Sequence, residues 1–196
     1  MIKLFFSFLL FYATSSFAQN DYKDSMRLFI KDYIDKHEVV KDKDRQYLHF
    51  FAIDPNFRIK TKFEKIENAP WFKMESTGLV KRMYRVYGKV HFAIHDTAVT
   101  LSVYQSQDLM KMDKYQDHLF IPFTDATSGI ETYEGGRYFD LTMNDIKNNI
   151  LVVDFNKAYN PYCAYVSNVY NCPIPPPENR LTVAIRAGEK AYGKSH

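Results

Sequence analysis

The sequence lacks the short motifs that identify common classes of enzyme. It contains no G-x-S-x-G segment, and no spacing of serine, histidine and aspartate indicates a catalytic triad. The segment "EGGRY", with Gly135 and Gly136, does not have the pattern of a phosphate-binding loop. The sequence therefore identifies neither a serine hydrolase nor a phosphate-loop protein, and no cofactor is expected.

Excess charge of one sign is also lacking. The formal net charge is +3 over 196 residues, and basic and acidic residues alternate in segments such as "VVKDKDRQ" and "KFEKIEN". This interspersed pattern is typical of a solvated surface, whereas a nucleic-acid-binding domain usually has a strongly basic patch. We expect no nucleic-acid partner.

Long apolar runs are absent after the first residues. "MIKLFFSFLLFYATSSFAQN" has one positive charge at Lys3, an apolar run from Leu4 to Tyr12, and small residues before Ala18. The run is shorter than the roughly 18 residues that a membrane span requires. No cysteine lies near the cleavage point, so a lipid anchor is not expected. Residues 1–18 are therefore predicted to be a signal peptide. We expect a soluble periplasmic or secreted protein without membrane insertion after cleavage.

Only two cysteines are present, Cys163 and Cys172. In an exported chain they are expected to form a disulfide. A redox dithiol usually has the tighter C-x-x-C spacing, and a zinc site would need two further ligands that no neighbouring histidine supplies. His91 and His95 lie four residues apart on an expected strand, about 13 Å along it, which is too far for one ion to bridge. No metal site is expected.

One helix stands out. Apolar residues recur at helical spacing from Tyr22 to Ile34, with lysine and aspartate between them. This pattern predicts an amphipathic helix of about four turns, capped by Asn20 or Asp21.

Strand patterns dominate the rest of the sequence. Alternating residues in "FRIKTKFEKI" predict a strand, and "LVKRMYRVYGKVHFAI", "HDT" and "AVTLSVYQ" predict a hairpin. Further strands are expected at "WFKMES", "DHLFIPF", "RYFDL", "NILVVDF" and "RLTVAIRAG", and "NILVVDF" is apolar enough to be buried on both faces. The connections are mostly too short for parallel crossovers. We predict a mainly β (α+β) fold, an antiparallel sheet curled into a barrel or sandwich with one N-terminal helix.

These patterns divide the chain into a signal peptide (1–18), a helix with its connector (19–45) and one β-rich domain (46–196). The domain contains an irregular stretch, "FNKAYNPYCAYVSNVYNCPIPPPENRL", which has five of the eight prolines. Proline fixes φ and removes a donor, so this stretch cannot join a central strand and is expected to be partly polyproline-like. Its tyrosines either seal the end of the β framework or bind a ligand that has an apolar face and hydroxyl edges, such as a sugar or an aromatic compound.

The second half of the sequence resembles a family described only as a domain of unknown function, number 1684. The resemblance is carried by "LFIPFTDATSGIETYEGGRYFDL", "VVDFNKAYNPYCAY" and "NCPIPPPENRLTVAIRAGEKAYG". It is close from about Phe120 to Gly193 and implies no activity.

Polar residues gather in the same motifs, and they are the candidate site. They are Asp125, Arg137, Asp154, Asn156, Tyr159, Asn160, Glu178 and Asn179. Asp125 is typical of a side-chain-capped turn with Thr127 and Gly129, and Gly135-Gly136 of a hairpin. Asp154 ends an apolar strand, where its carboxylate requires hydrogen-bond donors. It either holds the loop that follows or pairs with Arg137 and Glu178 on the floor of a pocket.

Three hypotheses remain open from the sequence. The first is a binding or accessory domain that holds a small polar or amphipathic molecule between the "DATSG–GGRY" turn and the Cys163–Cys172 loop. The second is a hydrolase or lyase acting on a sugar-like substrate, with Asp125 or Asp154 assisted by Arg137 and Glu178. The third is a structural protein of the envelope.

Overall fold

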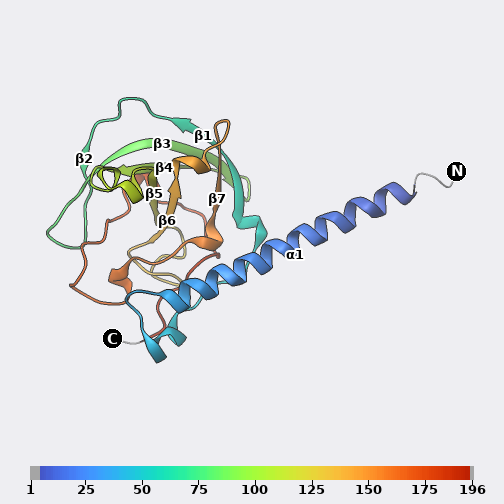
Figure 1. Ribbon diagram of the computed structural model, residues 1–196, viewed down its shortest axis with the longest axis horizontal. Helices are drawn as coiled ribbons and strands as arrows, with labels where there is room; N and C mark the ends of the chain where they lie inside the picture. The colour runs from blue at the N-terminus through green and yellow to red at the C-terminus, as the bar shows by residue number, and fades with distance from the viewer. Residues whose placement is uncertain (1–4, 195–196) are drawn as a thin grey trace.

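The computed structural model describes residues 5–194, with side chains from Gln19 to Lys194. Over these residues the framework is a seven-stranded antiparallel sheet that curls into an incomplete barrel (Figure 1). The strands are β1 (Arg58–Lys65), β2 (Phe72–Lys73), β3 (Met83–Ile94), β4 (Thr97–Ser106), β5 (His118–Phe123), β6 (Arg137–Thr142) and β7 (Ile150–Asp154). Their order is β6-β5-β4-β3-β1-β7, with β2 paired to β3. The predicted fold class is confirmed.

One long helix, α1 (Phe5–Lys36), precedes the sheet. Its N-terminal part projects from the body, and its C-terminal part runs along the side where β7 lies (Figure 1). The prediction that Asn20 or Asp21 caps the helix was wrong, because both lie within it. No glycine or proline in residues 5–19 interrupts the helix there. The predicted signal peptide, residues 1–18, lies outside the residues whose side chains are described.

Short 3-10 segments form the helical turns before, between and after the strands. They are η1 (Asp42–Tyr47), η2 (Pro55–Phe57), η3 (Leu109–Lys111), η4 (Asp113–Tyr115), η5 (Met143–Asp145), η6 (Phe155–Lys157), η7 (Tyr162–Ala164) and η8 (Pro177–Asn179). Within the described part of the chain, no helix combines the length and the apolar character that crossing a membrane requires.

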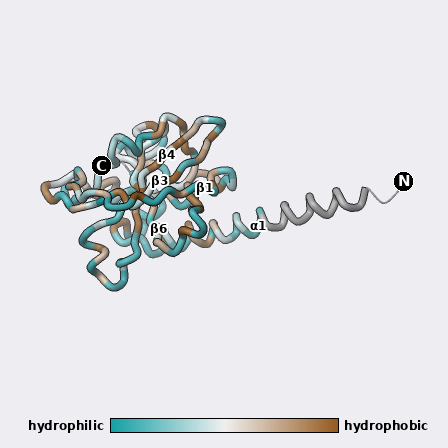
Figure 2. Tube along the Cα trace, turned by 90° about the horizontal axis from the view of Figure 1, so that it is seen from above, coloured by the Kyte–Doolittle hydropathy of each residue, from teal (hydrophilic) through white to brown (hydrophobic). Residues whose placement is uncertain are grey.

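The central hairpin follows the sequence pattern closely. β3 and β4 pair from Tyr84 and Ser106 to Ile94 and Thr97. The two residues between them, His95 and Asp96, both have positive φ, which matches the right-handed twist of the strands in a two-residue turn. Hydrophobic and hydrophilic residues alternate along the sheet, as the changes of colour along the tube show (Figure 2).

The main core lies inside the curl of the sheet, and β7 contributes only one face to it. Leu151 and Val153 are buried there, whereas Ile150 and Val152 are half-buried. The expectation that this strand is buried on both faces was wrong, because no element of the described chain packs fully over the face that carries Ile150 and Val152. Its outer face borders a groove.

The segment "RLTVAIRAG" was wrongly predicted to be a strand. Residues 180–188 form a single bridge, from Arg180 to Thr124, and otherwise run as irregular chain. Carbonyl groups of Ile185 and Ala187 accept hydrogen bonds from the buried guanidinium of Arg137. The guanidinium of Arg137 thus provides the hydrogen-bond donors that a neighbouring strand would otherwise provide.

The disulfide is confirmed, and it lies in a loop braced against a second loop. Cys163 and Cys172 are joined, with Cα atoms 6.3 Å apart. The backbone N–H of Thr77 donates to the carbonyl of Cys172, and that of Ile174 donates to Glu75. Pro176 has φ −62° and ψ 153°, so the expected polyproline-like conformation is present there.

Replacing both cysteines by serine should lower the free energy of unfolding by about 2–3 kcal/mol, because the bridge closes a ten-residue ring in the unfolded chain. Urea titration of the oxidised protein and the double variant measures this difference. Dithiothreitol should bring the wild type to the stability of the variant and leave the variant unchanged. A variant within 0.5 kcal/mol of the wild type would contradict the expectation.

Candidate functional site

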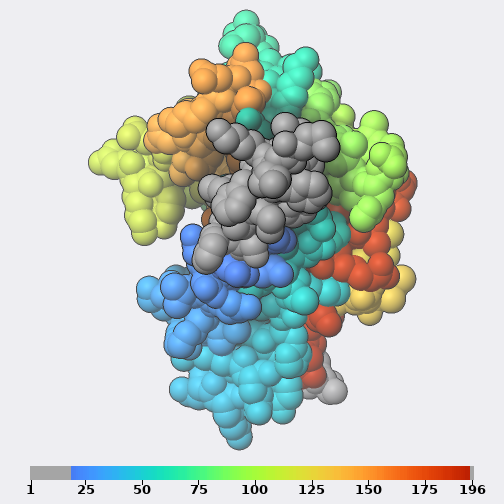
Figure 3. All heavy atoms as spheres, turned by 90° about the vertical axis from the view of Figure 1, so that its right-hand side faces the viewer, coloured from blue at the N-terminus to red at the C-terminus, as the bar shows by residue number. Residues whose placement is uncertain are grey.

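The two edge strands of the sheet, β6 and β7, border a groove of about 1280 Å³. α1 forms its opposite wall, and the disulfide loop forms one end. From the side on which α1 projects, the outline of the molecule is notched between α1 and the segment around residues 107–115 (Figure 3). Residues that line the groove include Phe29, Tyr33, Lys36, His37, Glu38, Tyr115, His118, Tyr138, Asp140, Val152, Asp154, Lys157, Tyr159, Tyr162 and Tyr170.

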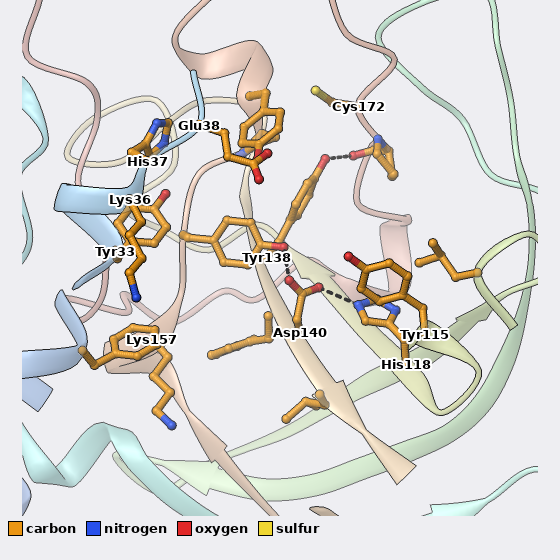
Figure 4. Close-up of a pocket in the computed structure, with 18 of the residues that line it drawn as sticks. Tyr33, Lys36, His37, Glu38, Tyr115, His118, Tyr138, Asp140, Lys157 and Cys172 are labelled. Carbon is orange, nitrogen blue, oxygen red and sulfur yellow. Dashed lines mark hydrogen bonds and ion pairs between the residues drawn. The ribbon is translucent and has the colours of Figure 1, made fainter. Parts of the chain in front are cut away.

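Asp140 lies at the centre of this groove (Figure 4). One carboxylate oxygen lies 3.0 Å from Nε2 of His118, and the other accepts a hydrogen bond of 2.6 Å from the hydroxyl of Tyr159. The side chain of Asp140 remains 50% exposed, so each oxygen has further acceptor capacity toward the groove. Asp140 is therefore a carboxylate held in place by the protein and accessible to a ligand.

Tyrosine side chains surround this carboxylate. Tyr33 comes from α1, Tyr115 from η4, and Tyr159, Tyr162 and Tyr170 from the stretch that follows β7. Burial and the neighbouring charge of Asp140 raise the pKa of Tyr159 well above its ordinary value, so its hydroxyl remains a donor at neutral pH. Tyrosine offers both an apolar ring and a polar tip, which suits a ligand that has both kinds of surface.

Two of the sequence-predicted site residues line the groove, Asp154 and Tyr159. Asp154 accepts hydrogen bonds from the hydroxyl of Tyr22 at 2.9 Å and from the backbone and side-chain nitrogens of Asn156. Asn156 also exchanges two hydrogen bonds with the backbone of Asp54. The bonds from Asn156 agree with the expectation that Asp154 holds the loop that follows it. The bond from Tyr22, which ties the end of β7 to α1, was not expected.

Arg137 does not pair with Asp154 or Glu178. Its guanidinium forms a fully buried ion pair with Asp125 at 2.6 Å. Asp125 also accepts from the backbone and hydroxyl of Thr127, which is the side-chain-capped turn expected from the sequence. In this turn region only Gly136 of the glycine pair has positive φ.

The other predicted residues hold separate parts of the fold together. Glu178 accepts from the hydroxyl of Tyr104 at 2.7 Å. Asn179 is completely buried and bonds the backbone of Ser102 and Pro122. The proposed floor of Asp154, Arg137 and Glu178 was wrong, since each of the three has its own partners.

Three important groups were missed from the sequence: His118, Asp140 and Glu189. Alternation in "RYFDL" would have placed Tyr138 and Asp140 on the face opposite to Arg137 and Phe139, which is a usable signal. No comparable pattern marks Glu189. Among the described residues, no three of the types His, Cys, Asp or Glu are close enough to hold a metal ion.

Glu189 is completely buried and cross-links three segments. It accepts hydrogen bonds from the hydroxyls of Tyr33 at 3.0 Å and Tyr165 at 2.7 Å, and from the backbone of Asn160 at 2.8 Å. Burial raises its pKa to about 7, although these donors and the charge of Arg137 act in the opposite direction. The carboxyl group therefore joins α1 and the disulfide loop to the C-terminal segment.

Comparison with known proteins assigns the chain to a family. A family model described as "Protein of unknown function (DUF1684)" matches residues 43–190. The chain belongs to this family. The match confirms the resemblance found in the sequence motifs, and DUF1684 as described carries no activity.

A solved structure shares the fold of this DUF1684 protein. It is the solution NMR structure of an uncharacterised protein from Haloarcula marismortui, with 26% identity and a TM-score of 0.66. The similarity covers 88% of this chain and 96% of that chain. A comparison with curated proteins found no match.

Replacing Glu189 by glutamine should change how stability depends on pH. Because the folded-state pKa is raised, the contribution of Glu189 is fully present below its unfolded pKa of about 4.5 and is lost as the pH rises through about 7. From pH 5 to pH 8, wild type should lose about 2–3 kcal/mol of unfolding free energy relative to Glu189→Gln.

Urea titrations of both proteins at pH 5, 6, 7 and 8 measure this difference. His37, whose pKa burial lowers to about 4, is present in both proteins and cancels in the comparison. Parallel curves for the two proteins would contradict a raised pKa at Glu189.

Proposed function

We propose that this protein is an exported binding domain that holds a small polar ligand with apolar faces in the groove between α1 and the β6–β7 edge. The position of Asp140 is the observation that supports this proposal most directly. It is a half-exposed carboxylate whose two oxygens are oriented by His118 and Tyr159, and it lies between tyrosine rings.

The distribution of hydrogen bonds supports a binding role for this carboxylate. Asp125, Asp154 and Glu189 are buried and bonded to several protein donors, which is what structural carboxylates require. Asp140 differs from these three carboxylates, because its side chain is 50% exposed and faces the groove. A ligand donor that bonds to it would make a charge-assisted hydrogen bond, which is among the stronger polar contacts.

Two features support export. The first 18 residues have the pattern of a signal peptide, and the domain contains a disulfide, which is typical of oxidising compartments. Cleavage before Gln19 would retain the α1 side chains of Tyr22, Met26 and Tyr33. Tyr22 and Tyr33 donate hydrogen bonds to the β-rich domain, and Met26 is buried.

Asp140→Asn should weaken ligand binding about 10- to 100-fold, because a charge-assisted hydrogen bond contributes about 1.5–3 kcal/mol. The probes are mono- and disaccharides, aromatic acids and short capped peptides, screened by thermal shift and followed by calorimetry. Asp140→Asn should keep the melting temperature of the free protein within a few degrees.

Glu64→Gln is the matched control. Glu64 lies 2.9 Å from His91 in a second exposed carboxylate–histidine pair, and neither residue lines the groove. This variant should bind like the wild type. A screen in which no class of compound stabilises the protein, or in which both variants lose binding equally, would count against the proposal.

Expression of the full-length chain with its leader in a bacterium that has a periplasm tests the export part. The mature protein should be recovered from the periplasm or the medium with Gln19 at its N-terminus. Intact-mass measurement identifies this species. A full-length protein retained inside the cell would contradict export.

A further inference from the structure

The outer edge of β7 presents unpaired backbone groups to the groove. Ile150 exchanges both of its backbone hydrogen bonds with Lys147, in a turn of its own chain. Successive residues of an antiparallel strand direct these groups to opposite edges. The N–H and C=O groups of Leu151 and Val153 therefore face β1, and both groups of Val152 and the N–H of Asp154 face away from it. The C=O of Asp154 belongs to the first turn of η6.

The same argument applies to β6. Tyr138 exchanges both backbone hydrogen bonds with Tyr159, on the side away from β5. Its partner on β5 is Pro122, which has no N–H to donate to β6, and this is consistent with the alternation. The backbone N–H of Thr142 also points away from β5 and donates to Asp145 at 2.7 Å. Asp140 lies between Tyr138 and Thr142 along β6, so its N–H and C=O groups are directed to the same open edge.

These groups border one groove. Asp140, Val152 and Asp154 all line it. Within residues 5–194 no turn, loop or side-chain hydrogen bond engages the edge-facing N–H and C=O groups of Asp140 and Val152 or the N–H of Asp154. The sequence of β7, "ILVVD", contains no lysine or proline, the residues that usually protect an exposed edge strand from pairing. The edge thus retains the chemistry of a strand that can accept a partner.

We infer that the ligand of this groove is an extended peptide segment that adds to the edge of β7 as a further strand. This inference rests on the proposed function and narrows its ligand class. β6 and β7 run in opposite directions, so a segment between them is antiparallel to one and parallel to the other. Both groups of Val152 and the N–H of Asp154 are available on β7, and antiparallel pairing is preferred there because parallel pairing is slightly less stable per residue.

Side chains of such a segment would alternate between the two sides of the strand. One set would face the tyrosines of the groove and the other would face solvent or α1. The groove has acids and bases in similar number, Asp32, Glu38, Asp140, Asp145 and Asp154 against Lys36, Arg58, Arg82 and Lys157. Main-chain pairing rather than net charge would therefore supply most of the recognition, with aromatic or β-branched side chains preferred.

A capped hexapeptide of alternating valine and threonine is the probe. Its binding should shift the amide resonances of Val152 and Asp154 in ¹⁵N-labelled protein and slow their hydrogen exchange at least tenfold. The same peptide with alternate amides N-methylated should lose binding at least tenfold in at least one of its two methylation registers, because it loses the donors on one edge.

Val152→Pro removes one donor of the edge, and Val152→Thr is its matched control. Proline is tolerated on edge strands where the N–H makes no ladder hydrogen bond, so the variant should keep the circular dichroism spectrum of wild type. Val152→Pro should weaken peptide binding at least tenfold and Val152→Thr less than threefold. If Val152→Pro fails to fold, the N-methylated peptides decide the question.

Several results would overturn the inference. They are the absence of peptide binding at millimolar concentration, equal binding of the N-methylated peptides in both registers, and binding that leaves Val152 and Asp154 unperturbed. A saccharide that binds in an Asp140-dependent manner while the peptide does not would reject the peptide and retain the proposed function. A dimer in light scattering that Val152→Pro converts to monomer would assign the edge to a second copy instead.

Discussion

The gap between β6 and β7 is the constraint on which the site depends. Six strands in the order β6-β5-β4-β3-β1-β7 would close a barrel if the two edges paired. They do not, because the chain leaving β7 crosses to β6 and Tyr159 occupies the position opposite Tyr138. At the other end, the side chain of Asp145 takes the N–H of Thr142. Between these two points the edges remain apart, and Asp140 and Val152 border the opening.

The surrounding parts are held by buried polar and charged side chains rather than by further strands. Arg137 donates hydrogen bonds to carbonyl groups of residues 185–189 and to the carboxylate of Asp125. Glu189 accepts hydrogen bonds from α1, the disulfide loop and Asn160. Removing one partner of such a buried set is costly, because it leaves an uncompensated charge in the interior. The irregular C-terminal segment can therefore be as well fixed as a strand, although it has no ladder of its own.

The sequence predicts the strands well, because most of them alternate or form the tight turn at His95 and Asp96. It also predicts the disulfide and the capped turn at Asp125, which depend on neighbours in the chain. The partner of Arg137 and the long-range partner of Asp154 could not be predicted in this way. Tyr22 and Asp154 are 132 residues apart, and a carboxylate after an apolar strand only indicates that donors are needed. Similarly, Glu189 lies in a polar tail with no periodicity that marks it as buried.

An open edge is useful for binding only if it stays open without its partner and does not pair with any available strand. The disulfide and the loop containing Thr77 restrict one end of the groove, and the Glu189 cluster restricts α1 along its side. A groove restricted in this way loses little conformational entropy when a ligand enters, which favours affinity. The same walls limit access, since only a segment that fits between α1 and the tyrosines reaches Val152. For the proposed peptide ligand, rigidity around the edge would thus serve both affinity and protection against unselective strand pairing.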